Sequence, residues 1–250
     1  MKSQSTYISS TSMFKGLATD VMGSRLELKF AGVPEKKAYG IWSDVTRELS
    51  RLDGIFNADD PESEVSVLNA SKVDIETSED MKLALNLCES YLIGTKGLFD
   101  INRGGREDLD FGGFAKGYAL RRIAALLKSA KVKDAFVDFG GSVIMALGKQ
   151  PYSDCWTYTL LDPWTDDELE QIELRSECLA VSCNCPQRSG HIVNPLNGQI
   201  EGSHRMSLVR AADPLDAQVL ALVMLLASAQ QKTEIAYNYK KAESRIIELA

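Results

Sequence analysis

Residues 109–119, with the sequence LDFGGFAKGYA, combine three glycines and a lysine at a predicted junction between a strand and a helix. Glycines allow backbone N–H groups to approach an anion closely, and the N-terminus of a helix carries a partial positive charge. Lys116 adds a full charge in the first turn of that helix. The segment therefore predicts a site for a diphosphate that includes Asp110, Gly112, Gly113 and Lys116, although the same residues would also suit an ordinary turn with a surface lysine.

A second glycine pair favours the phosphate interpretation. Residues 135–139 have the pattern of a buried strand, which leads into Gly140 and Gly141 and then into the apolar run 143–147. Two glycine turns therefore flank one predicted helix. Three further segments follow in the chain: the strand-like residues 179–182, the segment HIVNPLNG at 191–198, and DPLDA at 213–217, which begins the last strongly predicted helix.

In this order and at this spacing, the segments resemble the FAD:protein FMN transferase family, the ApbE-type flavin transferases. The most specific match is residues 110–118, which are similar to the family signature Asp-Leu-Gly-Gly-Ile-Ala-Lys-Gly-Tyr. The other matches are Met22-Gly23-Ser24 with the Met-Gly-Thr that precedes the family's first strand, 63–69 with Ser-x-Leu-Ser-x-Leu-Asn, 97–102 with Gly-x-Phe-Asp-Pro-Thr, 137–141 with Val-Asn-Leu-Gly-Gly, Ser182 with Thr-Ser-Gly, and 191–198 with His-Ile-Ile-Asn-Pro-x-Thr-Gly. Together the seven matches extend over most of the chain.

The resemblance implies an α+β or mixed α/β fold, with mixed sheets and packed helices around a central cleft. It implies one domain over residues 1–250, built as a single unit or as two tightly packed lobes. The implied activity moves FMN from FAD to a Ser or Thr hydroxyl of a target flavoprotein and releases AMP. FAD and a flavoprotein acceptor are therefore the expected partners.

The resemblance also implies which residues act. Lys116, His191 and Asp216 would be catalytic, with His191 handling a proton or contacting the diphosphate; the alternative for His191 is a turn residue beside Pro195. Met22 would pack on the flavin ring or simply fill the core. The residues expected to contact FAD are Met22, Gly23, Asp110, Gly112, Gly113, Lys116, Gly140, Gly141, Ser182 and His191.

A divalent ion, usually Mg²⁺, is also implied by the resemblance. Its ligands would be an Asp at the start of the last helix, the carbonyl of the Ala before the signature lysine, and a Thr one helical turn after the Asp. Asp216 and Ala115 fit the first two places, but Leu220 occupies the third and cannot bind a metal. With water or Gln218 left to fill the gap, we expect weak Mg²⁺ binding or none, and Asp216 then remains as a carboxylate at a helix N-terminus.

Other positions depart from the family in the same direction. Arg121 stands where the signature helix usually carries Asp, Asp138 replaces an Asn, and Ser142 follows the second glycine pair where Asp is common. Two alternatives to transfer therefore stay open: hydrolysis of FAD to FMN and AMP, and a non-catalytic flavin-binding protein that has lost its metal. A nicotinamide-binding Rossmann protein is disfavoured, because the glycine spacing at 112–117 is not G-x-G-x-x-G.

Composition limits the possible partners and compartments. The chain has 250 residues, of which 44% are hydrophobic and 25% charged, enough to bury a sizeable core. A net charge of −7, with no run of Lys or Arg longer than two, argues against a nucleic-acid partner. No apolar segment is long enough to span a bilayer. Residues 1–16 lack a signal-like apolar run, so we expect a cytoplasmic protein as the sequence stands, or a periplasmic one if an N-terminal segment has been removed.

Cysteine usage agrees with a reducing compartment. The five cysteines are odd in number, and the C-x-C at 183–185 is too little for a zinc site, so reduced thiols are expected.

Hydrophobic periodicity predicts helices at about 35–57, 77–94, 114–128 and 213–227, and strands at 25–30, 135–139, 143–147, 156–161, 179–182 and 207–210. Residues 237–249 give no clear pattern. The interleaved elements predict a domain in which the glycine turns converge on a cleft.

Overall fold

An eight-stranded antiparallel sheet organises the computed structural model, which describes residues 1–71, 75–102, 108–185 and 190–249. The strands lie in the order β1-β2-β3-β4-β5-β8-β9-β10. Their bounds are Lys2–Ile8, Met13–Val21, Ser24–Ala31, Asp134–Phe139, Val143–Leu147, Glu177–Cys183, Arg205–Ala211 and Glu243–Glu248. Strands β6 (Trp156–Leu161) and β7 (Glu168–Leu174) form a separate two-stranded sheet, and a 3₁₀ turn at Ser9–Thr11 connects β1 and β2.

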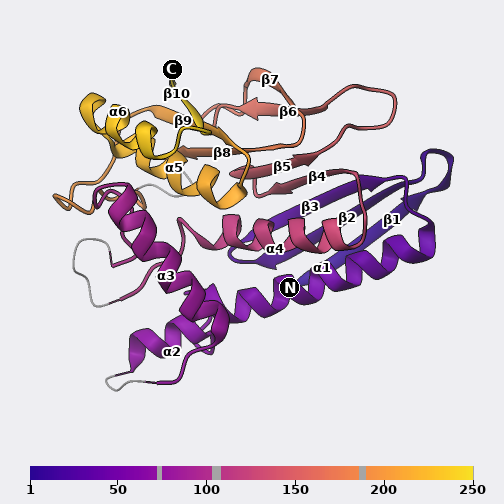
Figure 1. Ribbon diagram of the computed structural model, residues 1–250, viewed down its shortest axis with the longest axis horizontal. Helices are drawn as coiled ribbons and strands as arrows, with labels where there is room; N and C mark the ends of the chain where they lie inside the picture. Colours follow the sequence, from indigo (N-terminus) through magenta and orange to yellow (C-terminus); the bar gives the residue numbers. More distant parts are fainter. Residues whose placement is uncertain (72–74, 103–107, 186–189, 250) are drawn as a thin grey trace.

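Helices cover one face of the large sheet, and the two-stranded sheet covers the other (Figure 1). The helices are α1 (Glu35–Phe56), α2 (Glu64–Ala70), α3 (Glu79–Gly94), α4 (Ala115–Ser129), α5 (Pro214–Leu226) and α6 (Ala229–Asn238). Helix α5 packs on β8 and β9, α4 packs between α5 and α1, and α1 packs against β2. The α+β class predicted from the sequence is confirmed, but both sheets are antiparallel rather than mixed.

Two apolar clusters lie on the two faces of the sheet, because successive strand residues point to opposite sides. In β4, Val137 belongs to the cluster under the helices, whereas the preceding Phe136 packs with Trp156 and Leu160 of the small sheet. The helix-side cluster is the larger of the two and includes Phe14, Leu52 and the first two turns of α4.

Side-chain caps confirm the predicted starts of α3 and α5. The Ser78 side chain accepts a hydrogen bond from the Met81 N–H at the start of α3. Asp213 caps α5 by accepting from the N–H groups of Leu215 and Asp216, with Pro214 at the first helical position.

The sequence did not predict β1, β2, β7 or β10, nor α2 and α6. Met22-Gly23 was expected to precede the first strand, but β1 and β2 both come before it. Strand β1 is exposed over most of its length, and two of the buried residues of β2 are the small Gly16 and Ala18, so neither strand shows strong apolar alternation. A side chain on Gly16 of β2 would collide with the Trp42 ring, 2.7 Å from its added Cβ, which explains the small residue there.

Candidate functional site

Lys116 lies in the first turn of α4 and points to the turn that joins β4 and β5. Its Nζ donates a hydrogen bond to Ser142 Oγ at 2.7 Å, and that hydroxyl donates to the Phe139 carbonyl at 3.1 Å. The lysine charge is therefore fixed beside the second glycine pair. We call Lys116, Gly140, Gly141 and Ser142 the lysine cluster.

The glycine pair of this cluster has the left-handed backbone that favours glycine. Gly140 and Gly141 both have φ of 66°, and a Cβ at Gly140 would lie 2.1 Å from Ser24 Oγ. Ser24 directly follows Met22 and Gly23, whose φ values of 47° and 62° make the two-residue hairpin turn between β2 and β3. The two turns therefore lie side by side.

The strained backbone of Met22 is held by α1. The Met22 N–H donates to Asp53 Oδ1 at 2.6 Å, so a carboxylate from a distant helix fixes the hairpin turn. A non-glycine residue with positive φ is costly unless its surroundings hold it. The orientation of the half-buried Met22 side chain is thus set by the fold.

Two side chains fix the backbone of Gly141, one at its N–H and the other at its carbonyl. Asp138 Oδ1 accepts its N–H at 2.7 Å, and the Tyr158 hydroxyl donates to its carbonyl at 3.1 Å. Burial raises the pKa of the Asp138 carboxyl above its usual value, and burial also raises the pKa of Tyr158. The hydroxyl of Tyr158 therefore remains a donor at neutral pH.

Strand β8 brings Ser182 close to Ser142 of the lysine cluster. The N–H of Val181 donates to the Ser142 carbonyl at 2.9 Å, and the next residue, the half-buried Ser182, pairs with Ser207 of β9. A surface hollow of about 460 Å³ opens beside the glycine pair and is lined by Thr19, Asp20, Ser24, Arg25, Gly140 and Gly141. The structure thus gathers six of the predicted binding residues: Met22, Gly23, Lys116, Gly140, Gly141 and Ser182.

The first glycine turn packs against α5 through Gln218. Gln218 is 8% exposed; its Oε1 accepts the Gly117 N–H at 2.5 Å, and its Nε2 donates to the Gly112 carbonyl at 3.2 Å. A Cβ on Gly117 would lie 2.8 Å from Leu215 Cα, so this glycine permits the close approach of α4 to α5. The other part of the turn is closed by Asp110, whose Oδ1 accepts the Gly112 N–H at 2.6 Å.

These bonds engage several of the glycine N–H groups within the protein. Glycine N–H groups were expected to face an anion, yet those of Gly112, Gly117 and Gly141 each donate to a side-chain oxygen of the protein. The N–H groups of Phe114 and Ala115 likewise donate to the Phe111 carbonyl.

Asp216 lies in a different environment. It accepts a hydrogen bond from the Tyr91 hydroxyl at 2.5 Å. Tyr91, only 5% exposed, packs between Tyr239, whose ring is nearly parallel at 6.3 Å, and Phe99, whose ring is at 5.8 Å. Burial and the bond to Asp216 both raise the pKa of Tyr91, so the phenol stays protonated and keeps donating.

Arg121 completes this second group. Its guanidinium pairs bidentately with Asp213, with Nε to Oδ2 at 2.9 Å and Nη2 to Oδ1 at 2.8 Å. The pairing with Asp213, together with the charge of Asp216, raises the pKa of Arg121 despite its burial. We call Tyr91, Arg121, Asp213 and Asp216 the carboxylate cluster.

The residues here do not fit the magnesium ligand set that the resemblance implied. Mg²⁺ needs several oxygen donors in octahedral geometry. Leu220 is buried with 1% exposure at the expected hydroxyl position, both polar atoms of Gln218 are engaged, and Asp216 Oδ1 already accepts a hydrogen bond from the Tyr91 hydroxyl. Ala115, in the first turn of α4, supplies at most one carbonyl. Over the described residues, no three His, Cys, Asp or Glu side chains form a metal-binding group.

His191 is exposed and lies in the segment 190–200, outside the two clusters as defined. Gly190 donates to Asn184 Oδ1 at 3.0 Å, and Leu196 packs against Gly97 at the end of α3. A β-bridge between Val193 and Ile200 closes the segment. Nothing in this geometry distinguishes a catalytic His191 from a turn residue.

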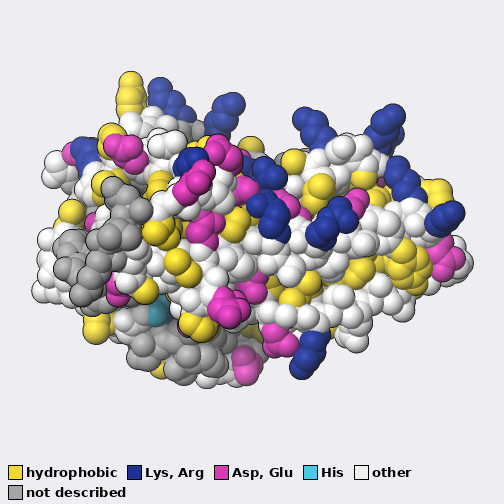
Figure 2. Space-filling model, turned by 90° about the horizontal axis from the view of Figure 1, so that it is seen from below, with side chains coloured by type: hydrophobic (Ala, Val, Ile, Leu, Met, Phe, Trp, Pro, Cys, Tyr) yellow, Lys and Arg dark blue, Asp and Glu magenta, His cyan; other side chains and the backbone are white. Residues whose placement is uncertain are grey.

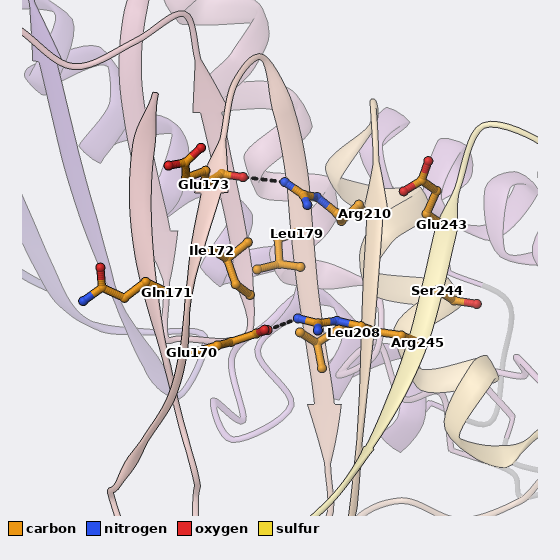
Figure 3. Close-up of a pocket in the computed structure, with 10 residues that line it drawn as sticks. All are labelled: Glu170, Gln171, Ile172, Glu173, Leu179, Leu208, Arg210, Glu243, Ser244 and Arg245. Atoms are coloured by element: carbon orange, nitrogen blue, oxygen red, sulfur yellow. Dashed lines mark hydrogen bonds and ion pairs between the residues drawn. The ribbon is translucent and has the colours of Figure 1, made fainter. Parts of the chain in front are cut away.

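A second cavity, of about 440 Å³, lies between β7 and the strands β9 and β10 on the opposite face of the sheet (Figure 3). Arg245 pairs with Glu170 across this cavity, and Arg210 binds the Glu173 carbonyl and the Glu177 carboxylate. Its arginines are thus already paired with protein oxygens. None of the predicted site residues lines it.

The surface has mixed charge on the face drawn in Figure 2, where Lys and Arg side chains stand in separate groups with Asp, Glu and hydrophobic side chains between them. In the described parts of the chain, no helix has the length and apolar character needed to cross a membrane.

Comparison with known proteins decides the family. The profile of the ApbE family matches residues 102–246, which is more than half of the chain and contains both glycine turns, α4 and α5. The chain belongs to the ApbE family. Curated protein sequences gave no match.

Solved ApbE structures share the fold. The flavin transferase ApbE of Vibrio cholerae has a TM-score of 0.80 at 16% identity, over 100% of this chain and 95% of that one. The apo flavinyl transferase ApbE of Pseudomonas stutzeri has a TM-score of 0.76 at 17% identity, over 100% and 92%. The ApbE protein of Thermotoga maritima has a TM-score of 0.78 at 17% identity, over 94% of each chain. At these identities, the likeness establishes the fold.

Sequence reasoning missed Tyr91, Asp53 and Tyr158. The signal for Tyr91 was present, because Met81, Ala84, Cys88 and Tyr91 form the buried stripe of α3 at helical spacing. Asp53 and Tyr158 gave no signal, because their roles depend on backbone groups of distant turns.

Proposed function

We propose that this ApbE-family chain binds FAD and transfers its FMN part to a Ser or Thr hydroxyl of a target flavoprotein, with release of AMP. The observation that carries the proposal is the Lys116 ammonium, fixed on Ser142 beside the Gly140-Gly141 turn. It lies in the segment that matches the family. We further propose that residues 1–250 act as one domain in this reaction.

The reaction forms one bond and breaks one. The acceptor hydroxyl oxygen bonds to the phosphorus of the FMN half, the bond from that phosphorus to the bridging oxygen breaks, and AMP leaves with this oxygen. The hydroxyl proton passes to a base. Because charge builds up on the phosphate oxygens, a fixed cation near them lowers the barrier.

Lys116 suits this task, because its ammonium is a cation held on Ser142 beside the Gly140-Gly141 turn. We propose Met22, Gly23 and Ser182 as neighbours of the flavin side, because their turns adjoin Gly140 and Ser142. His191 is our candidate for the group that accepts the hydroxyl proton.

A second candidate is a flavin-binding protein without turnover. It is favoured by the Tyr91 hydroxyl on Asp216 and by Leu220, which together occupy the family's metal position. Hydrolysis of FAD to FMN and AMP is a third outcome, with water in place of the acceptor hydroxyl at the same phosphorus.

One experiment separates these functions. Purified protein is incubated with FAD and a candidate flavoprotein acceptor, with and without Mg²⁺; nucleotides are separated by chromatography and the denatured proteins are weighed by mass spectrometry. AMP together with acceptor-bound flavin supports transfer, AMP with free FMN supports hydrolysis, and bound but unchanged FAD supports the binding protein. Absence of FAD binding would overturn the proposal.

Matched variants test the site. Lys116→Met removes the charge but keeps the stem, and we expect it to lower both FAD binding and AMP release. Lys128→Met, at the exposed last turn of the same helix, should leave both unchanged. Equal loss in the two variants would show a nonspecific charge effect.

A further inference from the structure

We infer that this chain has closed the divalent-cation position of its family with its own side chains, so that it holds FAD without a metal ion at Asp216. The first part concerns the apoprotein alone. The second part rests on the proposed function.

The Tyr91 hydroxyl stands where a cation would approach the carboxylate. A phenol donates a proton to Asp216 at 2.5 Å, which satisfies one oxygen without any metal. The aromatic neighbours Phe99 and Tyr239 fix the ring of Tyr91, so the hydroxyl has little freedom to swing away. A cation would therefore have to share the carboxylate with this bond.

The other candidate positions for a metal ligand are also unavailable to a cation. Leu220, one turn after Asp216, presents an apolar side chain in the buried core of α5. Gln218 cannot turn toward a metal without leaving the Gly117 N–H and the Gly112 carbonyl unpartnered in a buried setting. The chain therefore offers one shared carboxylate where Mg²⁺ needs several oxygens.

Protein cations provide charge from the same helix. Arg121 neutralises Asp213 and its positive charge also acts on Asp216, so it opposes a second cation there. Lys116, five residues earlier on α4, faces the Gly140-Gly141 turn instead. Arg121 thus supplies positive charge to the carboxylates, whereas Lys116 is held beside the proposed diphosphate position.

The test uses Mn²⁺, a paramagnetic substitute for Mg²⁺, titrated into the full-length apoprotein and followed by electron paramagnetic resonance. Wild type should leave the free Mn²⁺ signal unchanged. In parallel, FAD titrations followed by fluorescence should give dissociation constants within about two-fold in Mg²⁺ and in EDTA. The Mn²⁺ titration remains informative even if FAD does not bind, which separates this inference from the proposed function.

Variants should reopen the position. Tyr91→Phe removes the hydroxyl and keeps the ring, and Leu220→Thr restores the oxygen; we expect the double variant to bind Mn²⁺ at least ten-fold more tightly than wild type. The matched control combines Tyr239→Phe, on the ring that stacks on Tyr91, with Leu226→Thr, in the same helix α5. It should bind Mn²⁺ no more tightly than wild type. Tyr91→Phe alone, which should gain a smaller amount, serves if the double variant does not fold.

Two results would overturn the inference. One is a wild-type protein that binds one Mn²⁺ and loses it on Asp216→Asn. The other is a folded double variant, verified by circular dichroism, with no gain in Mn²⁺ binding.

Discussion

The lysine cluster and the carboxylate cluster share one helix, α4, which carries Lys116 and Arg121, but their charged groups have different surroundings. Lys116 contacts a neutral hydroxyl, Ser142, next to a surface hollow. Asp213 and Asp216 instead meet Arg121 and a buried phenol, so their charge is balanced inside the protein. A residue type retained at a motif position therefore does not guarantee a retained role, because its partners decide what it can still bind.

The contact of α4 with α5 connects the two clusters within the fold. Gly117 brings the helices together, and Gln218 ties the first glycine turn to α5. If this contact positions both clusters, changes to it should have the largest effects on stability, and changes within a cluster should have smaller, local ones.

The largest effect is expected from Gly117→Ala. Its Cβ would lie 2.8 Å from Leu215 Cα and 2.9 Å from the Pro214 carbonyl, both backbone atoms that cannot move aside. We expect a loss of about 3 kcal/mol in the free energy of unfolding, measured by urea denaturation. Gly40→Ala in α1 is the control: its Cβ meets nothing within 4 Å, and it should gain about 0.5–1 kcal/mol. Equal stability of the two variants would contradict the close helix contact.

The second effect is expected from Gln218→Met, which keeps the length of the side chain but removes both of its hydrogen bonds. The buried Gly117 N–H and the Gly112 carbonyl then lack partners, which should cost about 2–3 kcal/mol of unfolding free energy. Urea denaturation again provides the measurement. The control is Gln171→Met at an exposed position, which should change the free energy of unfolding by less than about 0.5 kcal/mol. Equal changes in the two variants would show that the hydrogen bonds of Gln218 do not stabilise the contact of α4 with α5.

The third effect concerns binding rather than folding. Lys116→Ala should weaken FAD binding by about 1–3 kcal/mol, because it removes a charge-assisted contact to phosphate. Asp216→Ala should leave FAD affinity nearly unchanged if the carboxylate cluster is closed to metal and ligand. Calorimetric titration of both variants compares the clusters directly, and a larger loss from Asp216→Ala than from Lys116→Ala would reverse our assignment.

How far the sequence predicts this protein follows from the range of its contacts. The start of α5 was predictable because Asp213 and Pro214 cap it locally. The turn at Gly140 and Gly141 was predictable because its two glycines are adjacent in the sequence. The bond from Tyr91 to Asp216 joins residues 125 positions apart, and the bond from Gly117 to Gln218 spans 101. No local pattern encodes such pairs, because only the packing of α3, α4 and α5 brings them together.

Strands at the sheet edges were missed for a different reason. Strands β1 and β10 are the outer strands and are mostly exposed, so their side chains need not alternate between apolar and polar. The central strands β4 and β5, buried on both faces, were predicted at nearly their observed bounds.

The smallest effect should be a pH dependence from Asp138, which accepts the Gly141 N–H beside the lysine cluster. Burial, helped by the negative charge of Glu27, raises the pKa of Asp138 above 3.8, and the Gly141 N–H opposes this shift. The charged or titratable groups that act on Asp138 are Glu27, Arg25, Lys29 and Tyr158. Because the folded protein binds this proton more tightly than the unfolded chain, the contribution of Asp138 to stability is complete below the unfolded pKa.

That contribution is lost as the pH rises through the folded pKa, so the sign is opposite to that of an ion-paired carboxylate. Asp138→Asn keeps an acceptor oxygen for Gly141 and removes the titration. The variant should therefore become more stable relative to wild type as the pH rises from acid to neutral. Urea denaturation of both proteins across that range measures the difference. A difference between wild type and Asp138→Asn that does not change with pH would mean that the pKa of Asp138 is the same in the folded protein and in the unfolded chain, which would contradict the raised pKa.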